Sequence, residues 1–437
     1  YFLIKIPYRE FKIFICMVFY NRSLMCLKRG DLFIMSNKAI GILTSGGDCG
    51  GLNSVIKGAA EMALYFGMKA YIIPNGYAGL YNLYDSGNII ELNEYLVDNI
   101  SSMMAGSEAG NSRVKIPKIQ DPDKYKKIKA GLSKYSIDCL VISGGDDTGS
   151  VVVDLAEKGI PCVHVPKTMD LDLQIYSVGG DSAINRIALF VEQLKTTGRS
   201  HNRIMIAEVF GRYAGHTAFR GGIAADADCI LIPEVPIDFD IIYEHMKKRF
   251  MERVSQSTYK SGTYLIVVSE GLTDLTGEHI TDNTASTDSF GHKKLSGTGK
   301  FVRSSLASRM KHDAEMEHFM KSQGLFVEEM NVLPEIRETV PGYLIRSGNT
   351  TALDANFGKD TGASAVVLIE NGITGVTVTG IKDGKINYVK THKAIKQRFV
   401  DLNMVSFYET MGVCFGRKPE KFKPEFEEVD APVCTYL

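Results

Sequence analysis

The chain has 437 residues, 44% of them apolar, and because single cores stop growing near about 250 to 300 residues, two domains are expected. Lysine and arginine total 50 and aspartate and glutamate total 51, so no global charge favours nucleic acid or an anionic membrane. The 8 cysteines are scattered without a CxxC pair, which argues against a zinc ribbon or a disulfide scaffold and fits a reducing cytoplasm.

The amino-terminal segment differs from the rest of the chain. It is apolar in patches, but charged residues such as Lys5, Arg9 and Arg22 keep every run below the about 18 residues of a membrane helix. Met35 directly precedes the first regular pattern. We therefore expect residues 1–36 to be an extension outside the fold, either an upstream translation or an unusual extension, with a weak amphipathic anchor as the alternative.

From residue 38 onward, short apolar runs alternate with helical patterns. The runs are continuous rather than alternating, which is typical of parallel strands covered by helices on both faces. The candidate strands are residues 39–45, 137–143, 161–166, 203–210, 228–234 and 263–270. This pattern predicts an α/β fold with doubly wound, Rossmann-like sheets, in which ligands bind beyond the carboxyl ends of the strands.

Helix and loop patterns complete this outline. Apolar residues at helical spacing follow the first strand and predict a core-facing stripe: Leu52, Val55, Ile56, Ala59 and Ala63. Residues 272–336 begin with polar clusters and continue as a charged helical stretch, so we expect an insertion with one helix and an irregular lead-in. The charged, proline-broken tail from residue 418 is expected on the surface.

Two glycine-rich loops follow strands, "TSGGDCGG" at 44–51 and "SGGDDTGS" at 143–150. Backbone N–H groups and the positive end of the next helix make such loops natural phosphate sites, although a turn without a ligand remains the alternative for the first. Neither loop matches a Walker A or a dinucleotide motif. Asp146 and Asp147 would repel phosphate in the second loop, unless Mg²⁺ bound through one or two carboxylates reverses the local charge.

A third loop, "PKTMDLDL" at 166–173, carries two more acids. If the segment is extended, Asp170 and Asp172 point to the same side. Neighbouring like charges raise the pKa of one carboxyl, as a general base requires. An Asx turn or ordinary surface acids are the alternative.

Arginines accompany the later strands. Arg203 enters a strand and Arg212 leaves it in "SHNRIMIAEVFGRYAGH", and "RETVPGYLIRSG" adds Arg337 and Arg346. Arginine suits bidentate recognition of phosphate, whereas a surface salt bridge is the ordinary explanation for each one alone.

These motifs, taken in order, closely resemble the 6-phosphofructokinase family from about residue 38 to about residue 410. The resemblance implies two doubly wound α/β domains with the active site in the cleft between them, and phosphoryl transfer to the 1-hydroxyl of fructose 6-phosphate. The expected domains are a donor domain of residues 37–181 and 345–395, a fructose 6-phosphate domain of residues 182–344 and 396–420 with the insertion at 272–336, and a tail of residues 421–437.

The resemblance also implies roles for single residues. Gly47 contacts the donor phosphates through its backbone, Arg113 neutralises donor charge and Asp146 holds Mg²⁺. Asp170 accepts the proton of the sugar hydroxyl and Asp172 supports the charge arrangement. The implied substrate-binding residues are Thr168, Met169, Phe210, Gly211, Arg212, Glu270, Tyr343 and Arg346, with Arg203 and Arg337 reaching the 6-phosphate from a neighbouring subunit. A homodimer or homotetramer is therefore expected.

Two positions depart from the ATP-using members, which carry glycine where this chain has Asp147 and Lys167. Asp147 excludes ATP by volume and like charge, and Lys167 stabilises the charge on a pyrophosphate leaving group. Tyr343 replaces a common histidine and favours the same branch. Phe210 stands for a methionine, and Met169 and Leu171 stand for isoleucine and asparagine, so the sugar pocket is slightly reshaped and one amide contact is missing.

The leading hypothesis is a reversible, Mg²⁺-using pyrophosphate:fructose 6-phosphate 1-phosphotransferase of glycolysis and gluconeogenesis, cytoplasmic, with neither nucleic acid nor membrane as a partner. One alternative is an ATP-dependent 6-phosphofructokinase that tolerates Asp147. The other is a non-catalytic sugar phosphate sensor or regulatory subunit, although a sensor needs no Asp146, Asp170 and Asp172. The sequence leaves open the oligomer size, any effector, the physiological direction and the role of the insertion.

Overall fold

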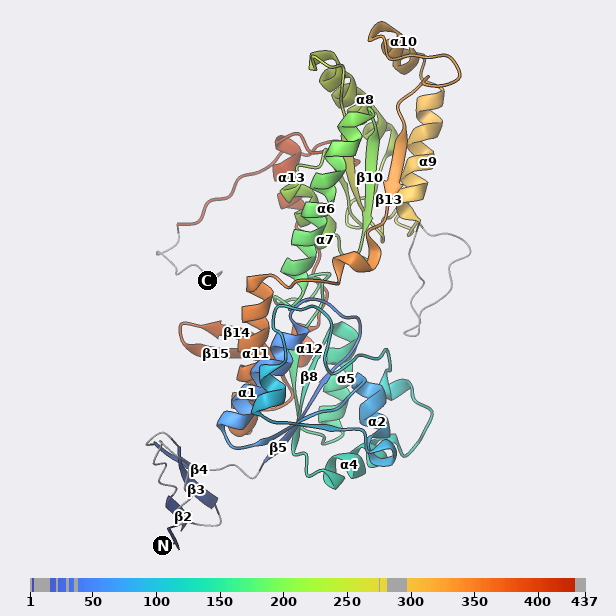
Figure 1. Ribbon diagram of the computed structural model, residues 1–437. Coiled ribbons are helices and arrows are strands. Elements are labelled where there is room, and N and C mark those ends of the chain that lie inside the picture. Colours follow the sequence, from blue (N-terminus) through green and yellow to red (C-terminus); the bar gives the residue numbers. More distant parts are fainter. Residues whose placement is uncertain are drawn as a thin grey trace. The chain divides into compact units, whose positions relative to one another are not determined.

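The structure is a computed structural model that describes residues 2–3, 16–20, 23–28, 31–34, 38–274, 276–280 and 297–428 (Figure 1). The chain divides into two compact units, residues 1–167 with 352–396 and residues 168–351 with 397–437. Each unit has its own sheet and its own hydrophobic core. None of the helices in the described part of the chain is long and apolar enough to cross a membrane.

The unit boundaries differ from the expected ones at 181/182 and 344/345. The first boundary lies between Lys167 and Thr168, because the segment before α6 (Gly180–Ser200) packs with that helix. Leu171 fills the space beside Gly180, where an added Cβ would lie 2.2 Å from its Cδ2 atom. The second boundary follows Thr351, whose N–H donates to Ser182 Oγ at 3.0 Å.

The sheet of the first unit has seven strands in the order β15-β14-β9-β8-β5-β6-β7. The strands are β5 (Ala39–Thr44), β6 (Lys69–Ile72), β7 (Ile90–Leu92), β8 (Cys139–Gly144), β9 (Cys162–Pro166), β14 (Val376–Lys382) and β15 (Lys385–Lys390). All neighbours pair in parallel except β6 with β7 and β14 with β15 at the two edges. The expected runs at 39–45, 137–143 and 161–166 are thus confirmed as parallel strands.

Helices cover both faces of this sheet. The longer ones are α1 (Leu52–Tyr65), α2 (Gly76–Ser86), α4 (Lys124–Lys134), α5 (Asp146–Glu157) and α11 (Ala352–Glu370), and the short ones are α3 (Glu94–Asp98), η1 (Ile116–Lys118) and α12 (Thr391–Ala394). Helices α1 and α11 lie side by side (Figure 1). The expected stripe on α1 is confirmed, because all five of its members are fully buried.

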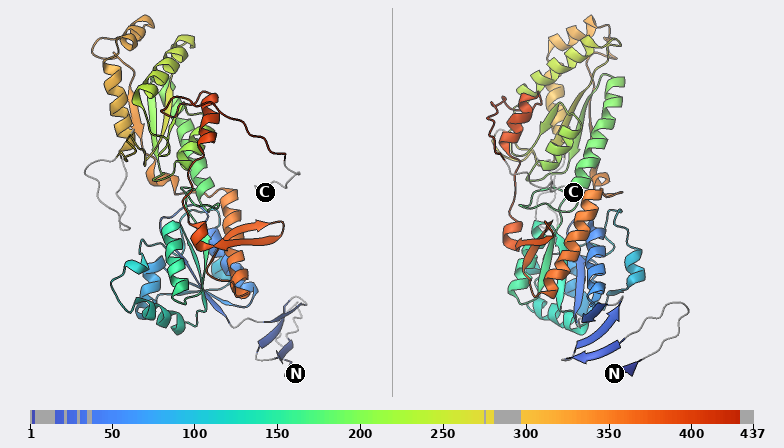
Figure 2. Two further views of the ribbon diagram at one scale, coloured as in Figure 1. Left: turned by 180° about the vertical axis from the view of Figure 1, so that it is seen from behind. Right: turned by 90° about the vertical axis from the view of Figure 1, so that its left-hand side faces the viewer.

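The sheet of the second unit is entirely parallel, in the order β11-β12-β10-β13. Its strands are β10 (Ile204–Val209), β11 (Cys229–Leu231), β12 (Tyr264–Ser269) and β13 (Ile336–Thr339). Helices α6 and α7 (His216–Ala224) cover one face, and α8 (Phe239–Gln256) and α9 (Thr298–Lys311) cover the other (Figure 2). Two further elements are η2 (Gly342–Ile345) and α13 (Leu402–Thr410). The doubly wound α/β fold is confirmed in both units.

The described residues of the region 272–336 contain two helices rather than the one expected. Asp313 separates α9 from α10 (Ala314–Ser322) because its carboxylate caps the second helix by accepting the Glu315 N–H at 2.9 Å. Val302 and Leu306 of α9 are fully buried in the core, so this helix is an integral part of the unit. The expected irregular lead-in falls mainly on residues 281–296, outside the described residues.

The amino-terminal segment forms a four-stranded antiparallel sheet in the order β1-β2-β3-β4. The strands are β1 (Phe2–Leu3), β2 (Cys16–Tyr20), β3 (Ser23–Lys28) and β4 (Asp31–Ile34). They hydrogen-bond among themselves, while the two larger sheets are built from other strands.

Candidate active site

Two glycine-rich loops of the first unit are fixed by backbone hydrogen bonds. After β5, the Ser45 N–H donates to the Ser143 carbonyl at 2.9 Å and the Gly46 N–H donates to the Ser112 carbonyl at 3.1 Å. Gly47 follows in the same loop, which leads into the amino terminus of α1. The loop therefore lies at a helix end that favours anions.

The second loop ends β8 and starts α5. No side chain fits at Gly144, because an added Cβ would lie 2.3 Å from the Thr148 side chain. Asp146 is the first residue of α5 and is exposed, and its Oδ1 accepts the Asp147 N–H at 2.7 Å. Its carboxylate lies at the positive end of the helix dipole, which stabilises its negative charge.

Asp147 is paired with a residue that the sequence analysis missed. The ammonium of Lys115 lies 2.6 Å from Asp147 Oδ1, and the two side chains are 25% and 24% exposed. Lys115 lies two residues after Arg113, on the segment whose Ser112 carbonyl holds the first loop. Nothing in the spacing of the sequence indicates this ion pair, whose members are 32 residues apart.

Lys167 joins the two loops. It directly follows β9 and is only 4% exposed. Its backbone N–H donates to the Gly144 carbonyl at 2.9 Å, and its ammonium donates to the Gly47 carbonyl. The structure thus brings Gly47, Asp147 and Lys167 to neighbouring loops at the carboxyl ends of β5, β8 and β9, as the sequence predicts.

His164 is a buried, neutral ring that hydrogen-bonds to the second loop. Its Nε2 lies 2.9 Å from the Gly144 carbonyl, which can only accept, so Nε2 is the donor. Nδ1 then accepts from the Thr377 hydroxyl at 3.0 Å. Burial lowers the pKa of His164 to about 4, with the nearby Lys167 charge acting in the same direction and the hydrogen bond to Gly144 opposing both. The ring is therefore uncharged near neutral pH.

The remaining donor-side residues lie on the surface of the first unit. Arg113 is exposed on the segment between Ser112 and Lys115. The described residues contain no group of three or more His, Cys, Asp or Glu side chains suited to a metal ion. A cation held by Asp146 would therefore take its other ligands from phosphate oxygens and water, an arrangement typical of Mg²⁺.

In the second unit, residues 168–172 form a tight turn. The Thr168 hydroxyl oxygen accepts the Asp170 N–H at 3.1 Å, and the hydroxyl donates to Asp172 Oδ1 at 3.3 Å. Leu171 has a φ of 55°, so the segment is not extended and the alternation proposed for Asp170 and Asp172 does not apply. Met169 is only 2% exposed, so we expect it to contact a substrate through its backbone rather than its side chain.

Arg398, another residue that the sequence analysis missed, braces this turn. Its guanidinium donates to the carbonyls of Leu171 at 2.6 Å and Leu173 at 3.0 Å, and its backbone N–H donates to the Asp172 carbonyl at 2.7 Å. His216 Nε2 donates to the Arg398 carbonyl at 3.1 Å. Burial lowers the pKa of Arg398, and the nearby Arg220 adds to this effect while Asp172 opposes it.

Glu270 is the centre of a charged cluster at the carboxyl end of β12. Burial raises its pKa to about 7, the Asp170 charge adds to this effect, and the charges of Arg212 and Arg346 oppose it. The Glu270 N–H donates to the Val209 carbonyl at 2.9 Å, which fixes its backbone beside the end of β10. The structure thus brings together Asp170, Arg212, Glu270 and Arg346, four of the residues predicted to bind the sugar or accept its proton.

Phe210 and Gly211 shape the wall of this cluster. Gly211 has a φ of 135°, and an added Cβ would lie 2.4 Å from Ser269 Oγ, so only glycine fits. The Arg346 guanidinium stacks over the Phe210 ring at 4.5 Å. A cavity of about 30 Å³ adjoins the cluster and is lined by Glu208, Val209, Phe210, Glu270, Val340 and Gly342. Tyr343 follows this lining and is 77% exposed.

Arg203 and Arg337 are not part of this cluster. Both pair with Glu335, at 2.7 Å from Arg203 Nε to Oε2 and 2.7 Å from Arg337 Nη2 to Oε1. These hydrogen bonds, the one from Arg337 first, lower the pKa of Glu335. The three residues lie at the amino ends of β10 and β13, whereas Arg212 follows the carboxyl end of β10. Six strand residues separate the two groups by about 20 Å.

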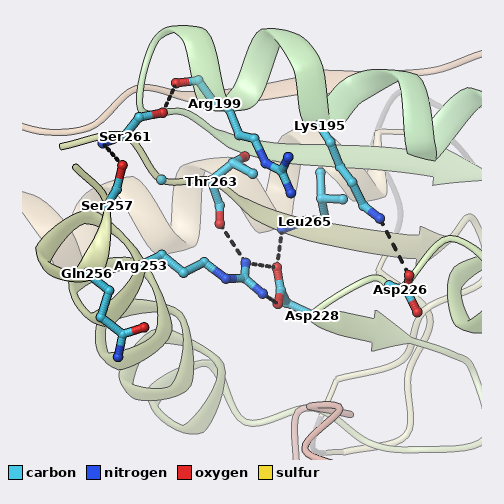
Figure 3. A pocket seen from close by; sticks show the side chains of 11 residues that line it. Lys195, Arg199, Asp226, Asp228, Arg253, Gln256, Ser257, Ser261, Thr263 and Leu265 are labelled. Carbon is cyan, nitrogen blue, oxygen red and sulfur yellow. Dashed lines mark hydrogen bonds and ion pairs between the residues drawn. The ribbon is translucent and has the colours of Figure 1, made fainter. Parts of the chain in front are cut away.

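Figure 3 shows a larger cavity. Thr263, one of its lining residues, donates its hydroxyl to the Arg203 carbonyl at 2.7 Å, so the cavity lies near that amino end. It has a volume of about 510 Å³ and lies between α6, α8 and the start of β12. Two ion pairs lie in its lining: Arg253 forms a bidentate ion pair with Asp228 at 2.5 and 2.7 Å, and Lys195 lies 3.8 Å from Asp226. None of the residues predicted for the active site lines this cavity.

Known proteins are similar to this chain in sequence and in fold. The sequence model of the family described as Phosphofructokinase matches residues 39–369. A pyrophosphate--fructose 6-phosphate 1-phosphotransferase from Dictyoglomus thermophilum is 30% identical over 79% of this chain and 90% of its own. An ATP-dependent 6-phosphofructokinase from Corynebacterium efficiens is 33% identical over 83% of this chain and 94% of its own.

A solved structure shares the fold. The pyrophosphate-dependent phosphofructokinase from Marinobacter aquaeolei superimposes with a TM-score of 0.61 at 19% sequence identity, covering 90% of this chain and 98% of that one. Because relatives of nearly equal identity differ in the donor that their names give, similarity alone does not assign the donor.

Proposed function

The chain belongs to the phosphofructokinase family, and we propose that it uses pyrophosphate, rather than ATP, to phosphorylate fructose 6-phosphate at its 1-hydroxyl. The observation that carries this proposal is the pair of side chains in the loops of the first unit, the largely buried Asp147 and the buried Lys167. In the ATP-using members that the sequence resembles, glycine leaves these two places open for a nucleotide. Here both places are filled.

On the donor side, the loops of the first unit bind pyrophosphate. The backbone of Gly47 and the amino terminus of α1 offer N–H groups to phosphate oxygens. Lys167, whose ammonium reaches the same loop, stabilises the negative charge that develops on the leaving phosphate. Arg113 adds a positive charge from the surface segment.

Mg²⁺ fits the donor side, and Asp146 is the residue that would hold it. The exposed carboxylate of Asp146 stands at the start of α5, and a single carboxylate with phosphate and water ligands is a common Mg²⁺ arrangement. When bound, the ion would neutralise the charge of the donor phosphates.

On the acceptor side, Asp170 takes the proton from the 1-hydroxyl as the hydroxyl oxygen bonds to phosphorus and the bridging oxygen of pyrophosphate leaves with the second phosphate. The turn braced by Arg398 holds Asp170 in place. Glu270, Arg212 and Arg346 bind the sugar phosphate, and Arg203 and Arg337 reach the 6-phosphate bound by a neighbouring copy of the chain.

A turnover assay tests the proposal directly. Purified protein with Mg²⁺ and fructose 6-phosphate should form fructose 1,6-bisphosphate with pyrophosphate, and much faster than with ATP. Turnover with ATP alone would overturn the proposal and favour the second candidate, an ATP-dependent 6-phosphofructokinase, which the relative from Corynebacterium efficiens supports. Replacing both Asp147 and Lys167 by Gly should then leave the donor preference unchanged, whereas in our reading it weakens the use of pyrophosphate.

A further inference from the structure

The ion pair between Lys115 and Asp147 gives the donor loop a property that Asp147 alone would not have. A bare carboxylate in a loop that binds polyanionic pyrophosphate would repel its own substrate as well as ATP. The Lys115 ammonium, 2.6 Å from Asp147 Oδ1, compensates that charge within the same unit. Lys167 has a different position, because its ammonium donates to the Gly47 carbonyl.

We propose that Lys115 is a specificity-determining residue that neutralises and fixes Asp147, so that Asp147 excludes a nucleotide by its volume while the loop still accepts pyrophosphate. This inference rests on the proposed function, because it concerns the same donor. It also changes the earlier expectation that like charge helps Asp147 to exclude ATP.

Both partners are held before any donor binds. Ile116, the residue after Lys115, is fully buried and anchors the segment in the core. Ser112 on the same segment accepts the Gly46 N–H at 3.1 Å and the Ser45 hydroxyl at 3.2 Å. On the other side, the Asp147 carbonyl accepts the Ser150 hydroxyl at 2.7 Å within the first turn of α5. The ion pair therefore connects two anchored backbones, and little side-chain freedom remains to be lost on binding.

The pair separates the effect of volume from the effect of charge. Asparagine has nearly the volume of aspartate but no charge, so Asp147→Asn keeps the obstacle and removes the carboxylate. Lys115→Met keeps the length of the lysine stem and removes the ammonium, so Asp147 loses this ion pair. The double variant removes both charges and keeps both volumes.

The experiment is a double-mutant cycle with K115M, D147N and K115M/D147N, in which kcat and KM for pyrophosphate and for ATP are measured at saturating fructose 6-phosphate. K115M should raise KM for pyrophosphate about tenfold or more, because the carboxylate then repels the donor. K115M/D147N should return KM to within about threefold of the parent protein, a coupling that independent sites would not show. D147N should keep the preference for pyrophosphate over ATP.

Two controls separate this effect from misfolding and from net charge. Lys115→Arg retains the positive charge and should keep the parent KM, even if K115M folds poorly. Lys126→Met removes one positive charge from an exposed position on α4 and should leave both constants unchanged.

The outcomes distinguish the two proposals. An unchanged KM in K115M, or a double variant no better than K115M, overturns the role of Lys115 while pyrophosphate stands as the donor. ATP use by D147N at the expense of pyrophosphate shows that charge, not volume, excludes the nucleotide, and also overturns it. If the parent protein turns over with ATP alone, the proposed function fails and this inference fails with it.

Discussion

Glu270 combines a carboxyl group that burial makes hard to ionise with two arginines that favour its ionised form. Its pKa is raised to about 7, above the ordinary value of 4.5, so the folded state holds a proton that the unfolded state releases between those pH values. Stability from this group is therefore present below pH 4.5 and is lost as pH rises toward 7. The loss is at most about 3.5 kcal/mol, from about 1.4 kcal/mol for each of the 2.5 pH units between the two pKa values.

We predict that Glu270→Gln removes this pH dependence. The free energy of unfolding, measured by urea denaturation without substrates at pH 5 and pH 8, should fall more for the parent protein than for E270Q. Exposed carboxylates such as Glu317 provide a control, since E317Q should follow the parent protein. Parallel pH dependence in E270Q and the parent would contradict the raised pKa.

A substitution of Asp170 distinguishes an enzyme from a protein that only binds the sugar. Loss of a general base lowers rates by about 10²- to 10⁴-fold. We therefore predict that Asp170→Asn lowers kcat by that factor, whereas calorimetry shows fructose 6-phosphate binding within a few-fold of the parent protein. If the parent protein binds the sugar and neither form turns over, the chain is a sensor rather than an enzyme.

Individual residues show which parts of the candidate site the sequence predicts and which it misses. The sequence predicts that Gly47, Asp147 and Lys167 lie beyond the carboxyl ends of strands, because each follows an apolar run, and parallel strands end at one edge of a sheet. Lys115 and Arg398 carry no such signal. Arg398 reaches the Leu171 carbonyl across 227 positions of the chain, and only the folded backbone brings these residues together.

Among the elements, α9 contacts the Glu270 cluster through its first turn. Its amino terminus is held by the buried carboxylate of Glu208 on β10, which accepts the N–H of Gly299 at 2.8 Å and of Gly297 at 3.3 Å. Thr298 in the same turn donates its hydroxyl to the Glu270 carbonyl at 2.9 Å. The start of α9 thus fixes the backbone of a residue that we expect to bind the sugar.

We predict that Glu208→Ala lowers the free energy of unfolding by about 2 kcal/mol, because it removes an anion from a helix terminus and leaves the buried Gly299 N–H and the partly buried Gly297 N–H without their acceptor. It should also raise KM for fructose 6-phosphate more than it lowers kcat, since Glu270 shifts while Asp170 stays. Denaturation and steady-state kinetics measure the two effects. Unchanged KM in a destabilised E208A would limit Glu208 to a purely structural role.

The sequence predicts six of the described strands in the two large sheets and misses five others. The six expected strands all exist because each is a continuous apolar run covered on both faces. The strands β7, β13 and β15 were not predicted, because most of their residues are partly or fully exposed and their apolar runs are interrupted. The strands β6 and β14 were also missed, although most of their residues are buried. At 168–172 the sequence left both an extended segment and a turn open, because nothing in the residue types predicts the positive φ of Leu171 that makes it a turn.

At the scale of the whole molecule, the placement of Arg203 and Arg337 bears on assembly. Both lie at the amino end of the second unit's sheet, about 20 Å along β10 from Arg212. This distance is too large for a small movement within the unit to bring Arg203 and Arg337 to the Glu270 cluster. If they bind the 6-phosphate, they do so at the site of another copy, and each complete site then combines residues of two chains.

Mixing inactive variants tests this arrangement. Asp170→Asn lacks the base, and Arg337→Ala lacks the 6-phosphate ligand, so each homo-oligomer should be nearly inactive. In a hybrid, one site combines Asp170 from the second variant with Arg337 from the first and is intact, while the other site lacks both. We predict that partial unfolding and joint refolding of the two variants restores up to about half of the parent activity per hybrid dimer, because one of two isologous sites is complete.

Joint refolding of D170N with Asp146→Asn is the matched control. The same chain supplies Asp146 and Asp170 to a site, so every site of this hybrid lacks one of the two carboxylates. Restored activity in the first mixture alone supports shared sites, and no gain over the separate variants would show that each chain carries its site alone.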